Sequence, residues 1–128
     1  MTFLLDTHVW LWMLADPDRL GALRGPLEDE ATTLLLSAVS SWEIAIKHSA
    51  GRLTLPEPPA TYLPPRIRAT GVTPIAIEHA HAVTAGSLPP HHRDPFDRLL
   101  VAQAMRMDVP IATADAALEP YGVPLLRP

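Results

Sequence analysis

Short apolar runs alternate along this chain with segments in which apolar residues recur every three or four positions. The runs are bounded by polar or turn-forming residues and predict five strands, at residues 2–5, 32–36, 73–77, 109–112 and 123–126. Helical spacing predicts helices at residues 9–14, 20–30, 40–50 and 78–85, and a further helix from residue 94. This order favours an α/β fold with a five-stranded, mainly parallel sheet and helices on both of its faces.

Local signals refine several boundaries. Ser40 and Glu43 match the capping-box pattern Ser-x-x-Glu at the start of a helix. Asp94 followed by Pro95 predicts another helix start, with Asp at the N-cap. Gly25-Pro26 is the expected break in the segment 20–30. Five of the 15 prolines fall in residues 56–65, so we expect a loop or a broken helical turn there, with residues 66–70 extending it as a helix.

Composition predicts one globular domain, residues 1–128, with 48% hydrophobic and 19% charged residues. No apolar run is long enough to span a bilayer and no basic segment precedes the first apolar stretch, so we expect a cytoplasmic protein without membrane contact. The absence of cysteine excludes disulfides and thiolate metal sites.

Four acidic residues stand where an apolar run ends or a helix begins: Asp6, Glu43, Asp97 and Asp115. In a parallel α/β sheet these places lie at the carboxyl edge of the strands, where open sheets bind ligands. Each acid taken singly has a structural explanation as a helix cap or a first-turn carboxylate. Four carboxylates at one edge repel each other, however, and capping needs no such convergence.

A divalent cation would relieve this repulsion. Oxygen ligands without any cysteine suit Mg²⁺, or Mn²⁺, better than Zn²⁺. The net charge of −4 points the same way, since subtracting these four acids from the 14 Asp and Glu residues leaves 10, equal to the 10 Lys and Arg residues. The chain's excess negative charge therefore equals the charge of the four acids in the proposed metal pocket. A bound divalent ion would reverse the local sign of the charge there. Such ions activate water and stabilise phosphoryl displacement.

The chain resembles the PIN-domain ribonucleases, specifically the VapC-type toxins of type II VapBC toxin–antitoxin pairs. The matching stretches follow the family's order: LDTHVWLW (5–12), SAVSSWEIAIK (37–47), HRDPFDRLLVAQA (92–104) and TAD (113–115). The resemblance implies a PIN-like three-layer fold and a Mg²⁺-dependent endoribonuclease that cleaves RNA with metal-activated water. It assigns the metal-binding and catalytic roles to Asp6, Glu43, Asp97 and the more variable Asp115. It also implies a cognate antitoxin, a homodimer, and a heterotetramer or larger assembly with the antitoxin.

Two other functions compete with this interpretation. One is a non-catalytic PIN-like binding module, against which the intact set of acids argues. The other is a haloacid-dehalogenase-type phosphatase, whose pattern places a second acid two residues after the first, where this chain has His8.

Several neighbouring residues have both a functional and a structural interpretation. We expect Lys47 to form a helical ion pair with Glu43, four residues before it. Arg93 and Arg98 flank the start of the helix predicted from residue 94 and are candidate phosphate contacts. For the histidines His8, His91 and His92, the expectation is a surface position or support of the acids. For the tryptophans Trp10, Trp12 and Trp42, it is packing in the core or in a dimer.

Overall fold

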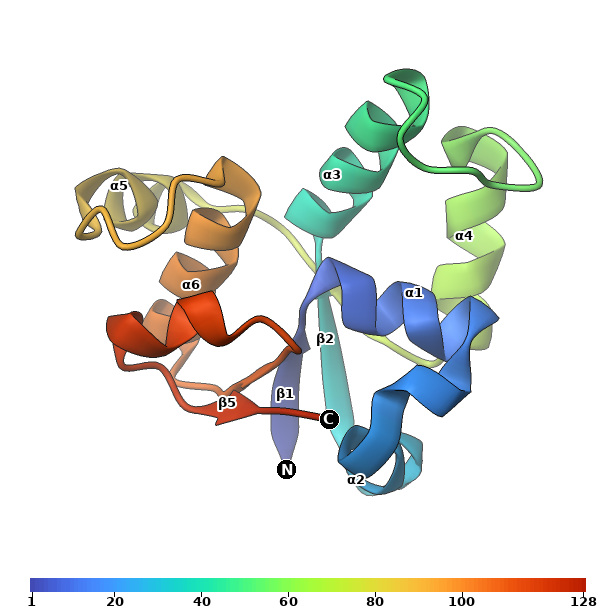
Figure 1. Ribbon diagram of the computed structural model, residues 1–128, viewed down its shortest axis with the longest axis horizontal. Coiled ribbons are helices and arrows are strands. Elements are labelled where there is room, and N and C mark those ends of the chain that lie inside the picture. Colours follow the sequence, from blue (N-terminus) through green and yellow to red (C-terminus); the bar gives the residue numbers. More distant parts are fainter.

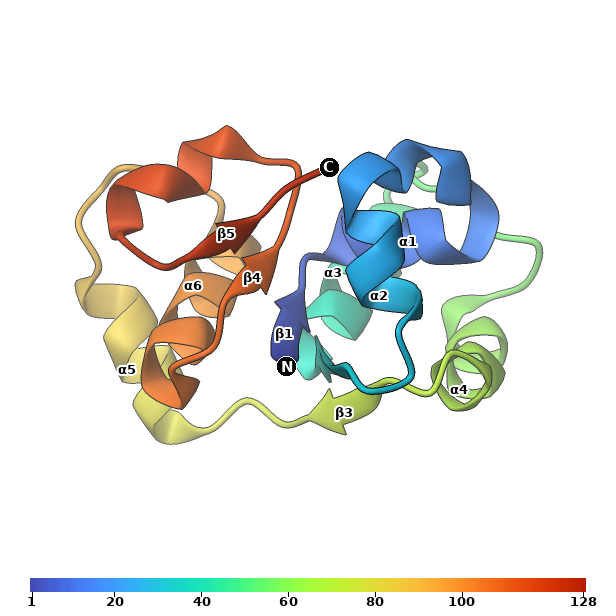
Figure 2. The same cartoon turned by 90° about the horizontal axis from the view of Figure 1, so that it is seen from below.

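The computed structural model describes residues 1–128 and places all five strands in one parallel sheet (Figures 1 and 2). The strands are β1 (Thr2–Leu5), β2 (Thr33–Ser37), β3 (Thr73–Ile75), β4 (Ile111–Ala112) and β5 (Leu125–Leu126). Their order across the sheet is β3-β2-β1-β4-β5, and every neighbouring pair is parallel. The expected five-stranded sheet is confirmed, and it is fully rather than mainly parallel.

Six α-helices and two 3₁₀ segments connect the strands. They are α1 (Thr7–Ala15), the 3₁₀ segment η1 (Pro17–Leu23), α2 (Arg24–Glu28), α3 (Ala38–Ser49), α4 (Pro59–Ala69), α5 (His79–Ser87), α6 (Pro95–Met107) and the 3₁₀ segment η2 (Ala116–Tyr121). Figure 2 shows α5 and α6 on one side of the strands and α1, α2 and α4 on the other.

Successive residues of the strands belong to two separate hydrophobic clusters, one on each face of the sheet. Phe3 and Leu5 of β1 pack with residues of α1, η1, α2 and α4, whereas Leu4 packs with residues of α6 and η2. A strand turns successive side chains to opposite faces, so strands that are apolar at both alternating positions require cover on both sides. The prediction of helices on both faces of the sheet is confirmed.

The strand order reverses at β1, which creates a crevice at the carboxyl ends of β1 and β4. The chain runs from β1 outward through β2 to β3, then crosses back through α5 and α6 to β4 on the other side of β1. Open α/β sheets bind ligands at such a switch point. Asp6 directly follows β1, and Thr113 directly follows β4.

Three local predictions were wrong. Residues 59–65 of the proline-rich segment are helical and belong to α4, with Pro64 and Pro65 inside it, whereas residues 56–58 precede the helix and residues 66–69 continue it, as expected. Proline removes a hydrogen bond from a helix interior and crowds the preceding turn. The buried side chains of Tyr62 and Leu63 join the hydrophobic cluster under α1, and this packing holds the segment helical.

The other two errors concern helix boundaries. The third helix begins after Ser37, whose hydroxyl accepts a hydrogen bond from the Val39 N–H at 3.1 Å, so Ser40 lies inside it. The segment 20–30 breaks at Gly21, with a left-handed φ of 52°, rather than at Gly25-Pro26. No helix in the structure is long and apolar enough to cross a membrane.

Candidate metal centre

The Asp6 carboxylate is fixed on one side and lacks any partner on the other. Asp6 is 4% exposed, and its backbone N–H donates to the carbonyl of Ala112 in β4 at 2.9 Å. The Thr113 hydroxyl donates to Oδ2 at 2.6 Å, whereas Oδ1 is buried with no hydrogen-bond partner. The side chain makes no capping bond to α1, so helix capping does not explain this acid.

Glu43 shows the same asymmetry on α3. It is 2% exposed, and its Oε2 lies 2.5 Å from Lys47 Nζ, which confirms the predicted pair. Its Oε1 is buried without a partner. The predicted capping-box role is wrong because Ser37 caps this helix. One step along the chain from Asp6, the Thr7 hydroxyl donates to Ser40 Oγ at 2.8 Å, which ties the start of α1 to α3.

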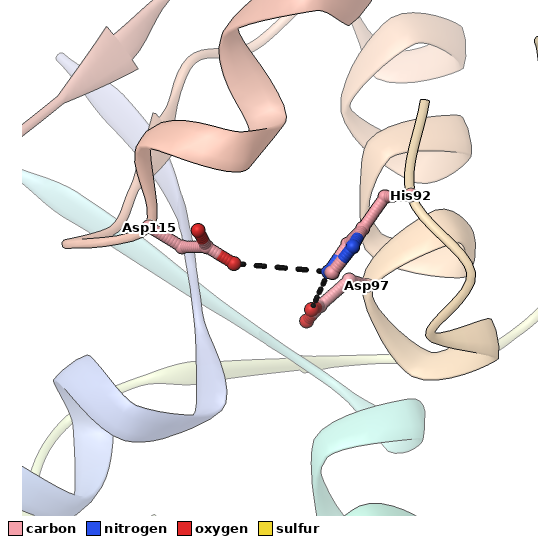
Figure 3. Close-up of side chains that lie close together, drawn as sticks. All are labelled: His92, Asp97 and Asp115. Atoms are coloured by element: carbon pink, nitrogen blue, oxygen red, sulfur yellow. Dashed lines mark hydrogen bonds and ion pairs between the residues drawn. The ribbon is translucent and has the colours of Figure 1, made fainter. Parts of the chain in front are cut away.

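Asp97 and Asp115 meet around His92 (Figure 3). Asp94 caps α6 as predicted, accepting from the Phe96 N–H at 2.8 Å, and so places Asp97 in the first helical turn. His92 Nε2 lies 2.7 Å from Oδ2 of Asp97 and 3.7 Å from Oδ2 of Asp115. One ligand atom from each of these three side chains lies within 4.8 Å of the others.

Asp115 also acts as a helix cap, which was its structural interpretation in the sequence. Its Oδ1 accepts from the Ala117 N–H at 2.9 Å and caps η2, while its backbone N–H donates to Thr113 Oγ1 at 3.0 Å. Thr113 therefore links the two acids that follow β1 and β4. The second carboxylate oxygen of Asp115 is the one that faces His92.

Burial and mutual repulsion raise the pKa of two of the acids. Burial raises the pKa of Asp6, and the nearby Glu43 adds to this effect, while the Thr113 hydrogen bond and His8 oppose it. Burial, followed by the Asp6 charge, raises the pKa of Asp97 to about 7, although the hydrogen bond with His92 lowers it. Carboxylates that disfavour their own charge in this way are stabilised by a nearby cation.

The structure brings three predicted acids around one pocket and the fourth beside it. Asp6, Asp97 and Asp115 line a cavity of about 280 Å³ together with His8, Trp12 and Ala114, which we call the acid pocket. Glu43 lines an adjoining cavity, and His8 lines both. The repulsion among Asp6, Glu43 and Asp97 shows that the two cavities belong to one electrostatic site.

These residues fit a hard divalent cation. Two buried carboxylate oxygens, Asp6 Oδ1 and Glu43 Oε1, have no donor in the protein. Buried acceptors are normally satisfied, so two such oxygens at one site indicate that they bind an ion. The acids supply only oxygen atoms, which Mg²⁺ and Mn²⁺ prefer.

Sequence reasoning missed parts of the support around the acids. His92 was expected only to lie at the surface or to assist, and nothing in the sequence indicated that it would reach both Asp97 and Asp115. The suggested phosphate role of Arg98 is wrong. Its guanidinium is used internally, donating to the carbonyls of Ala85 and Leu88, each at 2.9 Å, and to other groups of the loop before α6.

Comparison with known protein families identifies the fold. The PIN domain model matches residues 3–123, nearly the whole chain. The chain belongs to the PIN-domain family. The five-stranded parallel sheet with its covering helices is thus the fold of a PIN domain.

Two relatives carry VapC names. Ribonuclease VapC22 of Mycobacterium tuberculosis is 32% identical over 127 residues, covering 96% of this chain and 94% of that protein. Ribonuclease VapC16 of the same organism is 44% identical over 64 residues, which span 50% of this chain and only 45% of that protein.

Solved structures agree with this PIN fold. VapBC2 from Rickettsia felis, bound to a DNA fragment from its promoter, has a TM-score of 0.72 at 15% identity, covering 99% of this chain and 98% of that one. DNA-bound VapBC from Salmonella typhimurium has a TM-score of 0.73 with the same identity and coverage. At this identity the likeness concerns the fold alone.

Proposed function

We propose that this PIN domain, residues 1–128, is a Mg²⁺-dependent endoribonuclease and the toxin of a type II toxin–antitoxin pair, with Mn²⁺ able to replace Mg²⁺. The observation that carries this proposal is the pair of buried, unpartnered oxygens, Asp6 Oδ1 and Glu43 Oε1, beside the raised-pKa carboxyl of Asp97. The ribonuclease names of the two relatives supply the substrate class.

Each acid has a distinct part in the proposed site. Asp6 and Asp97 would be the principal ligands, with Glu43 and Asp115 assisting directly or through water. When bound, the ion supplies the positive charge that activates water and stabilises the phosphoryl transition state. Thr113 and His92 hold Asp6 and Asp97 in place by hydrogen bonds of 2.6 and 2.7 Å. Lys47 limits the rotation of Glu43.

A cleavage assay tests this proposal directly. Purified protein should cleave a single-stranded RNA reporter with Mg²⁺ or Mn²⁺, and EDTA should abolish cleavage. Asp6→Asn and Asp97→Asn should each lose at least a hundredfold in rate. Asp108→Asn is a matched control, because Asp108 is an exposed acid at the far end of α6 whose left-handed backbone suits Asn.

The same variants separate the alternative functions. A non-catalytic module would bind RNA and show no metal-dependent cleavage in any variant. A phosphatase of the haloacid-dehalogenase type would hydrolyse a phosphomonoester such as p-nitrophenyl phosphate and leave RNA intact.

Partner proteins follow from the comparisons. Because the similar solved structures are VapBC assemblies bound to DNA, we propose that a cognate antitoxin binds this chain. We also propose a homodimer. Of the tryptophans expected to pack in the core or in a dimer, Trp10 is fully buried in the core and therefore does not contribute to a dimer surface. The large exposed apolar side chains of α3 are Trp42 and Ile46. Sedimentation at micromolar concentration showing monomer alone would contradict the dimer.

A further inference from the structure

A second cavity of about 280 Å³ opens beside the acid pocket, between the start of α1 and the C-terminal part of α3. We call it the α1–α3 cavity. His8 lines both cavities, and Glu43 lines this one while repelling the acids of the other. A polymer with one phosphate at the acid pocket would therefore have room for its next unit here.

The walls of the α1–α3 cavity combine apolar and cationic groups. Leu11, Ile44 and Leu53 form its apolar part and pack on the core under α1. Lys47 and Arg52 line the same cavity. An apolar surface with a few polar groups is typical of a site for a flat organic ligand, and a cationic group suits a phosphate.

Arg52 is available for a ligand, whereas Lys47 is already paired. Of the 10 Lys and Arg residues, only these two line either cavity. Lys47 contacts Glu43, but the exposed side chain of Arg52 forms no ion pair or hydrogen bond in the structure. Its planar guanidinium can bind two phosphate oxygens at once.

Arg52 would supply positive charge that the acid pocket lacks. The acid pocket has no Lys or Arg, so even with a metal bound it offers the RNA backbone positive charge at one point only. The neighbouring phosphate would otherwise face Glu43 and the acids without a counter-charge.

We propose that the α1–α3 cavity is a nucleotide subsite, in which Arg52 binds the phosphate next to the cleaved one and the leucines contact the attached nucleoside. This inference rests on the proposed ribonuclease function and makes Arg52 a substrate-binding residue. It places the substrate strand along the start of α1, over His8.

The test compares Arg52→Ala and Arg52→Lys with Arg106→Ala, a matched control that removes one exposed, unpaired arginine from the last turn of α6. Binding of a short fluorescein-labelled single-stranded RNA is measured by anisotropy over a range of salt concentrations, in an Asp97→Asn background that does not cleave. Arg52→Ala should weaken binding about tenfold and reduce the salt slope by about 0.7, the value for one single-strand phosphate contact. Arg52→Lys should keep the slope and recover part of the affinity.

Cleavage kinetics provide the second measurement. With Asp97 restored, Arg52→Ala should raise KM with little change in kcat, because the contact is made equally in the ground and transition states. Thermal melts should be unchanged, since the Arg52 side chain is exposed and forms no ion pair or hydrogen bond, and its backbone bond to the Lys47 carbonyl is kept in the variant. Equal RNA affinity, salt slope and KM for Arg52→Ala and Arg106→Ala would overturn the subsite and leave the ribonuclease proposal standing. Wild-type protein without any cleavage would overturn the ribonuclease proposal, while the anisotropy series would still report on Arg52.

Discussion

The Thr113 hydroxyl donates a hydrogen bond to Oδ2 of Asp6 over 2.6 Å, although the two residues are 107 positions apart in the sequence. The contact exists because β4 lies beside β1, so that the residues following each strand meet at the edge of the sheet. The same hydroxyl accepts from the Asp115 N–H. One side chain thus orients the acids that follow β1 and β4.

Thr113→Val should weaken metal binding and shift its pH dependence. Valine keeps the shape of threonine but removes the hydroxyl that donates to Oδ2 of Asp6. In the wild-type protein this hydrogen bond lowers the pKa of Asp6 and opposes the effect of burial. We expect a loss of about tenfold in Mn²⁺ affinity at pH 7, with the affinity curve moving to higher pH, measured by calorimetric titration. Thr113→Ser should restore both. Equal curves for Thr113→Val and wild type would show that Asp6 does not depend on this contact.

Asp97→Asn should stabilise the metal-free protein at alkaline pH. The pKa of Asp97 is raised from 3.8 to about 7, so between these values the folded state holds a proton that the unfolded state has lost. The free energy of unfolding therefore falls as pH rises through this window, by on the order of 2–4 kcal/mol for this one group. The variant should melt at higher temperature than wild type at pH 8 in EDTA and resemble it at pH 4.

Thermal melts at several pH values, followed by circular dichroism, check this prediction. Asp108→Asn is the control, and its melting temperature should follow that of wild type at every pH. A fall in stability of Asp97→Asn at pH 8, combined with retained cleavage, would favour a purely structural role for Asp97 in the first turn of α6.

Metal binding should release a proton near neutral pH. The ion and the proton compete for the Asp97 carboxyl, whose pKa is about 7. Affinity should therefore rise as pH increases up to about 7 and level off above it. Titration calorimetry at pH 6.5 in two buffers of different ionisation enthalpy measures the protons released. Asp115→Asn, which retains Asp97, should show the same release, and a value near zero for wild type would argue against Asp97 as a ligand.

Arg98→Ala should destabilise the fold through the loop that carries His92. The guanidinium donates to carbonyl oxygens of Ala85, Leu88, Pro89 and His92 at 2.9–3.2 Å. Loss of a charged donor to these largely part-buried carbonyls costs about 1.5–3 kcal/mol of folding free energy, which chemical denaturation would detect. Arg98→Lys should recover only part of the lost stability, because an ammonium group cannot reproduce the planar fork of the guanidinium. Arg106→Ala serves as control, and an effect of Arg98→Ala no greater than that of the control would contradict this role.

Local signals in the sequence predicted the elements whose ends are set by neighbouring residues. Asp94-Pro95 correctly located the start of α6, and with it Asp97, because an Asp cap and a first-turn proline act within a few residues. The predicted strands correctly put Asp6 and Asp115 at the same edge of the sheet. Parallel strands joined by crossovers all point the same way, so the residues that follow them lie at one edge.

Contacts between distant elements decided the parts that the sequence could not predict. Pro64 and Pro65 remain helical because Tyr62 and Leu63 are buried, and no local rule weighs that packing against the proline penalty. Whether Arg98 faces solvent or the loop carbonyls likewise depends on the approach of α5 to α6. The meeting of His92 with Asp97 and Asp115 depends on the path of the loop before α6.

An antitoxin should block the acid pocket with a basic side chain. The pocket has three carboxylates and no Lys or Arg, so a single cation inserted from a partner would relieve the same repulsion as a metal ion. Arg suits this task better than Lys, because its fork can bind two carboxylate oxygens. Antitoxin affinity should therefore fall as Mg²⁺ rises, and fall with Asp6→Asn or Asp97→Asn. Replacing one tail arginine of the antitoxin with alanine should restore partial RNA cleavage. An affinity indifferent to all three changes would indicate that the partner instead covers the RNA path, including the α1–α3 cavity, without entering the acid pocket.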